Sequence, residues 1–236
     1  MQSLKARALP LIATVLLCGV FLKLGWWQWS KAVELEQRLA RQEAVDRETP
    51  LLIGSSLLDV TEAQGRRAQV RGHYAYESEF FLDNQQHQGR PGLHVITPLQ
   101  IEGTPTRVLV NRGWVGWGSS RAELPQVAVP AGRVQVQGRA VVPIGKAPAF
   151  VSEAVGNSEA LRTRIRLDDI QAHANFPVQP VVIWMTSSDV TDGLIREWPE
   201  VTNKAPMHKG YAAQWFLMAL LLLAFFLRSS YRKANV

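Results

Sequence analysis

Cysteine is almost absent from this chain: Cys18 is the only one among 236 residues. A single thiol excludes an internal disulfide framework and any metal or redox motif that needs two thiols. Cys18 lies inside an apolar run, where burial as a small hydrophobic side chain is the default interpretation. Glycine-rich phosphate loops, HExxH metal motifs and nucleophile elbows are also missing from the sequence. Catalysis has little support, and we expect a protein that is not an enzyme.

Acidic residues are absent from both ends of the chain, since all 20 lie between Glu34 and Glu200. Residues 31–209 carry equal numbers of acidic and basic side chains. The net charge of +6 therefore comes from basic residues within or beside two apolar runs: Lys5, Arg7, Lys23, Arg228, Arg232 and Lys233. Such a distribution is typical of membrane flanks. It does not form the clustered basic face, with interleaved aromatic residues, that predicts a nucleic-acid partner.

Two stretches have almost no charge and are long enough to cross a lipid bilayer. Residues 9–29 contain only Lys23, and as a helix they extend about 31 Å, against a hydrocarbon core of about 30 Å. No small-x-small cleavage site follows them, so we expect an uncleaved span rather than a signal peptide. Residues 210–227 are uncharged and predict a second transmembrane helix. Residues 30–49 predict a helical stalk that continues the first span.

The charged flanks predict the orientation of both spans. Basic residues lie on the outer side of each span, which favours a cytoplasmic location for residues 1–8 and 228–236. Residues 50–209 then form a periplasmic domain. Little sequence precedes the first span, so we expect no mitochondrial transit peptide and place the protein in a bacterial inner membrane, with lipid as a partner.

Residues 50–209 alternate between apolar and polar side chains, which is typical of β-strands. The predicted strands cover residues 68–74, 79–82, 93–99, 107–111, 133–141 and 180–185. Residues 83–92 predict a polar connection, glycines break the pattern after residue 111, and residues 167–175 predict one short helix. We therefore expect a membrane protein whose two transmembrane α-helices flank a mainly antiparallel β domain, either a small barrel or a sandwich.

Tryptophan and glutamine gather at one end of both apolar runs. The first run ends in Trp26-Trp27-Gln28-Trp29, and the second contains Tyr211 and Gln214-Trp215 shortly after His208. His208, Tyr211 and Trp215 follow an i, i+3, i+7 spacing that predicts one helix face. Amide side chains are costly near lipid unless they are hydrogen bonded, so we expect Gln28 to bond across the helix pair, for example to Gln214.

These helix ends allow two interpretations. In the first, the aromatic residues form an interfacial belt, the glutamines join the helices, and His208 is solvated. In the second, Gln28, Trp27, Tyr211, Gln214 and Trp215 line a shallow pocket for haem, with His208 as the axial ligand of its iron. Lys23, Lys31 and Lys209 are then candidates to neutralise propionates, although Lys23 can equally extend to the interface. His73, His87, His94 and His173 lack metal-ligand spacing and predict surface or edge-strand positions.

Three motifs in order resemble the Surfeit locus family of cytochrome c oxidase assembly factors, the Shy-type proteins of mitochondria and bacteria. Leu24-Gly25 and Trp27-Gln28 are similar to the first-helix motif of that family. Gly89, residues 95–99 and residues 108–115 are similar to its central signature, and His208, Tyr211-Ala212 and Gln214-Trp215-Phe216 to its second-helix motif. The resemblance covers nearly the whole chain. Lys31 stands where the family usually has arginine.

The resemblance implies an assembly factor that binds haem a, transiently, or the nascent catalytic subunit of the oxidase, with haem a synthase as a further candidate partner. The role of haem ligand transfers to His208. For Asn111, Arg112 and Trp114, one interpretation is a tight turn with a core tryptophan, and the other is contact with the oxidase subunit. Two competing functions remain: a membrane-anchored scaffold that binds the subunit without haem, and, with least support, a sensor or tethered hydrolase.

Overall fold

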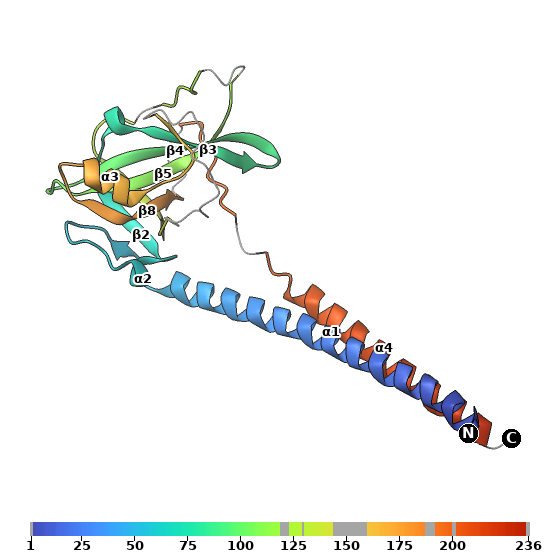
Figure 1. Cartoon of the computed structure of the whole chain (residues 1–236). Helices are drawn as coiled ribbons and strands as arrows, with labels where there is room; N and C mark the ends of the chain where they lie inside the picture. Colours follow the sequence, from blue (N-terminus) through green and yellow to red (C-terminus); the bar gives the residue numbers. More distant parts are fainter. Residues whose placement is uncertain are drawn as a thin grey trace. The chain divides into compact units, whose positions relative to one another are not determined.

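Figure 1 shows a computed structural model of the chain, which describes residues 2–118, 123–128, 130–143, 160–186, 192–199 and 202–234. The chain divides into two compact units. The first contains Met1–Glu43 and Glu200–Val236, and the second is Ala44–Pro199. The expected cytoplasmic ends fall partly on residues 1, 235 and 236, outside the described residues, as do the side chains of Lys5, Arg7, Arg232 and Lys233.

The first unit is a pair of long helices, α1 (Gln2–Arg47) and α4 (Ala205–Ala234). Both are long and apolar enough to cross a membrane. The apolar and charged parts of α1 form one unbroken helix, which covers residues 30–47 of the predicted stalk. Contacts of Cys18 with Ala219 and of Gln28 with His208 show that the helices run antiparallel.

Small residues let the two helices approach closely. The less exposed positions recur at alternating spacings of three and four, which is the coiled-coil pattern: 14, 18, 21, 25, 28 and 32 on α1, and 205, 208, 212, 215 and 219 on α4. We call these positions the seam. A Cβ atom on Gly25 would lie 2.6 Å from the Phe216 ring, so a larger residue there would force that ring to shift. Cys18 lies on the seam, half-buried, with Sγ 3.6 Å from the Ala219 carbonyl oxygen.

The second unit is built around a closed β-barrel. Its main strands are β2 (Arg67–Tyr74), β4 (Arg90–Ile101), β5 (Arg107–Gly116), β6 (Val134–Val141) and β8 (Val178–Met185). They pair in the order β2-β6-β8-β5-β4, and β4 pairs again with β2, which closes the barrel. Only the β5–β8 pairing within this ring is parallel. The structure thus selects the barrel over the sandwich and confirms a mainly antiparallel domain.

Smaller elements complete the sheet and cover one side of it. β3 (Phe80–His87) and β7 (Leu161–Arg162) extend beyond β4, and β1 (Leu51–Leu52) pairs with β2. The helices are α2 (Val60–Ala63), the 3-10 turn η1 (Tyr76–Ser78) and α3 (Leu167–His173), which lies over the strands in Figure 1. The short helix predicted at residues 167–175 is present and ends at His173.

Two apolar clusters bury opposite faces of the central strands. Val108 and Val110 of β5 point into the barrel core, which Val70, Val136 and Ile183 also form. Successive side chains on a strand point to opposite faces. The intervening Leu109 therefore packs on the other face, against a second cluster beneath α3: Phe80, Ile96, Ile165 and Val182, with Leu167 and Ile170 partly buried.

Two expectations about the strands were wrong. The polar connection at residues 83–92 is a hairpin, in which β3 and β4 pair down to His87 and Arg90 and the turn is Gln88-Gly89. Both turn residues have positive φ, at 47° and 77°. Gly113 and Gly116 do not end the strand either, since β5 continues through them and Gly113, at φ 148°, sits at a bulge opposite Val95. Both predictions were wrong because polar residues and glycines, which usually indicate a connection, lie here in paired strands.

Candidate functional site

A hydrogen bond joins the two helix ends. His208 Nδ1 lies 2.7 Å from Gln28 Oε1, across the seam between α4 and α1. Both side chains are half-buried, and the buried Ala32, Ala205 and Ala212 surround them on the seam. The heptad-like spacing explains the contact between His208 and Gln28, because it places both residues on the helix face that meets the partner helix.

This bond assigns a tautomer to the imidazole of His208. An amide oxygen only accepts hydrogen bonds, so this contact requires a proton on Nδ1, and in the neutral ring that proton leaves the lone pair on Nε2. Histidines that bind metals are held in the same way, with one ring nitrogen donating to an oxygen and the other free to ligate. The arrangement can therefore present Nε2 as a ligand without further rearrangement of the ring.

The expected bond between Gln28 and Gln214 does not form. Gln28 bonds to His208, and Gln214 is exposed. Tyr211 is 46% exposed, so it does not share the face of His208 and Trp215. The seam runs from position 208 through Ala212 to position 215, which explains the error: the next seam position is i+4, not i+3.

Aromatic side chains surround this site unevenly. Trp215 lies on the seam, with its ring centroid 5.7 Å from that of Phe21. Trp27 is 52% exposed and lies on the outer surface of α1. The residues expected to line one pocket are thus divided: Gln28, His208 and Trp215 meet at the seam, whereas Trp27, Tyr211 and Gln214 face outward.

Two of the three candidate propionate partners already pair with carboxylates. Lys31 Nζ lies 3.1 Å from Glu34, on the same helix. Lys209 Nζ lies 2.7 Å from Glu36 of α1 and 5.7 Å from the centroid of the Trp29 ring. Lys23 is exposed on α1. A ligand carboxylate would have to compete with Glu34 or Glu36 for the first two lysines.

Arg112, a candidate for partner contact, lies in the interior of the barrel domain. Its side chain is 1% exposed, and its guanidinium bonds to Glu79 at 3.1 Å, to Asp192 at 3.2 Å and to the Ala128 carbonyl at 2.6 Å. Arg196 also pairs with Asp192, at 2.5 Å. A buried charge is tolerated when it is paired and hydrogen bonded, which this network achieves.

The neighbours of Arg112 in the motif are buried as well. Asn111 is 1% exposed, and Trp114 is 8% exposed and donates its indole N–H to the Gln85 carbonyl. None of the three side chains is presented to a partner. The expected tight turn is also wrong, because all three lie within β5. Their burial favours the interpretation of Trp114 as a core residue.

The sequence does not identify the acidic partners of Arg112. Glu79 and Asp192 are single carboxylates far apart in the chain, and nothing in their local sequence distinguishes them from surface charge. Burial also affects a nearby phenol: desolvation raises the pKa of Tyr74, which lies 5.5 Å from the Arg112 guanidinium, well above its usual value.

The sequence predicts a surface or edge-strand position for His94, and this prediction is wrong. It lies on β4 between β3 and β5, packs against Trp184 and Trp198, and accepts a hydrogen bond from Asn111 at 3.2 Å. Desolvation in this setting lowers the pKa of His94 to about 4. Among the residues that the structure describes, no group of three or more His, Cys, Asp or Glu side chains could hold a metal ion.

Comparison with known proteins identifies the family. The sequence model of the SURF1 family matches residues 15–220, which include both helix ends and the whole barrel. The chain belongs to the SURF1 family. This is the Surfeit locus family that the three motifs resemble, and the chain is a membrane protein in which two apolar helices flank a β-rich domain.

Two relatives carry the name SURF1-like protein. The one from Drosophila melanogaster is 28% identical over 163 residues, covering 61% of this chain and 53% of the relative. The one from Monosiga brevicollis is 24% identical over 216 residues, covering 85% of this chain and 80% of the relative. The chain therefore spans about half the length of the fly protein and most of the length of the second.

Proposed function

We propose that this protein is a non-enzymatic assembly factor for haem–copper cytochrome c oxidase, in which His208 binds haem a for delivery to the catalytic subunit. The observation that carries the proposal is the 2.7 Å bond between His208 Nδ1 and Gln28 Oε1. Membership of the SURF1 family supports the general role in oxidase assembly. We place the site at the periplasmic face of a bacterial inner membrane, with both termini in the cytoplasm.

The residues at the helix ends fit haem as a transient cargo. Iron is bound by a ring nitrogen that carries a lone pair, and an Nδ1–H that donates to Gln28 keeps Nε2 for that role in the neutral ring. Trp215 places an aromatic ring on the seam with His208, and exposed Lys23 offers a charge for a propionate. A site with one protein ligand and open sides suits a cargo that must leave again for the nascent catalytic subunit. Haem a synthase is a candidate source of that cargo.

The test uses absorption spectra of the full chain purified from cells that make haem a. We expect wild-type protein to carry haem, and His208→Ala to lose most of it because the axial ligand is gone. His73→Ala, which removes an exposed histidine on β2, is the matched control and should keep the haem. Haem-free wild-type protein, or a His208→Ala spectrum equal to that of wild type, would exclude the ligand role.

The second candidate function is a scaffold that binds the oxidase subunit and does not itself bind haem. The observation that favours it is the pairing of Lys31 and Lys209 with Glu34 and Glu36, which leaves fewer cations for propionates. The scaffold hypothesis predicts that a His208→Ala strain still assembles active oxidase, while deletion of the barrel domain abolishes it. Measuring oxidase activity in membranes of both strains separates the two functions.

A further inference from the structure

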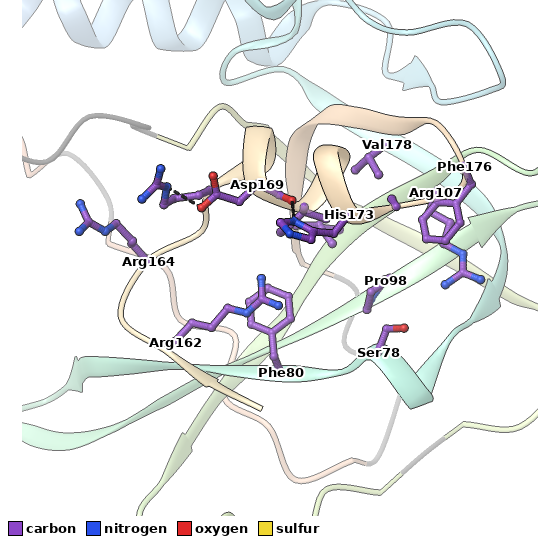
Figure 2. Close-up of a pocket in the computed structure, with 14 residues that line it drawn as sticks. Ser78, Phe80, Pro98, Arg107, Arg162, Arg164, Asp169, His173, Phe176 and Val178 are labelled. Carbon is purple, nitrogen blue, oxygen red and sulfur yellow. Dashed lines mark hydrogen bonds and ion pairs between the residues drawn. The ribbon is translucent and has the colours of Figure 1, made fainter. Parts of the chain in front are cut away.

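A cavity of about 520 Å³ opens on the barrel domain beneath α3 (Figure 2). Its volume lies within the usual range of small-molecule sites, about 300–1,000 Å³. Strands β3, β4, β5, β7 and β8, the turn η1, the segment between β7 and α3, and helix α3 all contribute to its wall. The residues that line it are Ser78, Phe80, Pro98, Arg107, Leu109, Arg162, Arg164, Arg166, Asp169, Ile170, His173, Ala174, Phe176 and Val178.

Positive charge predominates in the described lining of this cavity. Four arginines line it, and Asp169, whose Oδ2 is bound by Arg166 at 2.7 Å, is the only carboxylate among the lining residues that the structure describes. Figure 2 shows Arg162 and Arg164 on one side of the space and Arg107 on the other. His173 adds a further nitrogen at the rim, because its Nδ1–H donates to the Asp169 carbonyl at 2.7 Å and leaves Nε2 outside that bond.

Aromatic rings hold two of these arginines in place. The Arg107 guanidinium lies 4.0 Å from the centre of the Phe176 ring, and that of Arg162 lies 4.4 Å from the centre of the Phe80 ring. Stacking on a ring orients the planar guanidinium while its N–H edge can still bond to a ligand. Such orientation before binding reduces the entropy lost when a ligand is held.

Arg107 also has an unsatisfied donor. Its buried Nε has no hydrogen-bond partner among the residues that the structure describes, and its ion pair with the exposed Glu77 is long, with 3.7 Å between Nη1 and the carboxylate. A buried guanidinium N–H without an acceptor is costly. The floor between the arginines is apolar, formed by Phe80, Leu109 and Ile170.

We propose that this cavity is a binding site for a small amphipathic anion, an apolar body that carries a carboxylate or a phosphate. The arginine forks match the oxygens of either group, and each such bond is charge-assisted. The apolar floor takes the body of the ligand, as in most small-molecule sites. The site lies wholly within the barrel unit and does not depend on the haem proposal.

The test uses 1-naphthyl phosphate as the probe, titrated into the full chain in phosphatidylcholine nanodiscs and followed by calorimetry. We expect one saturable site. Arg162→Gln should weaken binding about tenfold or more, the change that follows from loss of one hydrogen bond to a charged group. Arg133→Gln is the matched control, because Arg133 is an exposed arginine that pairs with Glu102 and does not line the cavity. It should bind as wild type does.

Two further measurements separate the parts of the proposal. Ser78→Trp narrows the cavity at an exposed residue without removing a charge, and should also weaken binding. Naphthalenemethanol, which lacks the anion, and inorganic phosphate, which lacks the apolar body, should each bind at least tenfold more weakly than the probe. The proposal would be overturned if the probe showed no saturable binding, or if wild type, Arg162→Gln and Ser78→Trp bound it with equal affinity. It would also be overturned if naphthalenemethanol or inorganic phosphate bound as tightly as the probe.

Discussion

At the scale of single residues, Arg112 shows how a charge can be part of a protein core. Its guanidinium bonds to Glu79, Asp192 and the Ala128 carbonyl, and these partners come from three distant segments of the chain. The network ties β5 to the turn before β3 and to residues 192–196, which have no strand pairing of their own beyond one bridge at Ile195. Arg112 thereby helps to position residues 192–196.

Removing the Arg112 side chain should strongly destabilise the domain. Arg112→Ala leaves Glu79 and Asp192 without their shared cation in a largely buried site, a change that costs about 3–5 kcal/mol. Urea unfolding of the full chain in nanodiscs, followed by tryptophan fluorescence, measures this loss. Arg133→Ala breaks only an exposed pair, with Glu102, and should cost no more than about 1 kcal/mol. Equal stabilities of the two variants would contradict the role of the network.

His94 should make the stability of the domain depend on pH. Its pKa is about 4 in the folded protein and about 6.5 in an unfolded chain, so between these values the unfolded chain binds a proton that the folded domain does not. Its contribution is therefore fully present above about pH 6.5 and is lost as pH falls towards 4, by about 3 kcal/mol in total. Urea unfolding at a series of pH values measures the loss.

The matched variants for this prediction are two substitutions of histidine by glutamine. His94→Gln keeps a hydrogen-bond acceptor for Asn111 but cannot titrate, so it should flatten the pH dependence between 4 and 6.5. His73→Gln, at an exposed position on β2, should leave the dependence as in wild type. An unchanged slope in His94→Gln would show that other groups cause it.

At the scale of elements, the contact between α1 and α4 depends on small residues along the seam. A valine at Gly25 would place its Cβ within 2.6 Å of the Phe216 ring, so we expect Gly25→Val to push the helices apart. Spin labels at the exposed positions 22 and 217, in a Cys18→Ala background, would report a longer distance between the helices. Haem content should fall together with the loss of the Gln28–His208 bond.

Gly19 supplies the control for that experiment. It lies on the same helix, and a Cβ atom there would meet nothing within 4 Å. Gly19→Val should therefore leave the distance between the labels unchanged. If Gly25→Val gave the same distance as Gly19→Val, the close approach at Gly25 would not control helix packing.

At the scale of the whole molecule, the flanking charges predict the orientation in the membrane. In a Cys18→Ala background, we expect a cysteine at exposed position 133 to react with an impermeant maleimide once the outer membrane is opened. A cysteine at exposed position 231 should react only after the inner membrane is also broken, because the basic residues beside it remain in the cytoplasm. The opposite labelling pattern would reverse the proposed topology.

Much of the architecture could be predicted from local patterns. Long uncharged runs indicated α1 and α4, and alternation of apolar and polar residues indicated β2, β4, β5, β6 and β8. Both signals are short-range, because they depend on the periods of the helix and the strand. The errors occur where polar residues belong to paired strands, as at residues 83–92, and where a buried residue is polar, as at Arg112 and His94.

The sequence by itself therefore determined that two apolar helices flank a β-rich domain, and that glutamine and histidine lie at their ends. Only the tertiary structure decided that Gln28 bonds to His208 rather than to Gln214, that the strands close into a barrel, and that arginines gather beneath α3. The physical reason is distance along the chain. Periodicity and charge act between neighbours, whereas the phase of one helix against another and the partners of a buried charge depend on contacts between residues far apart in sequence.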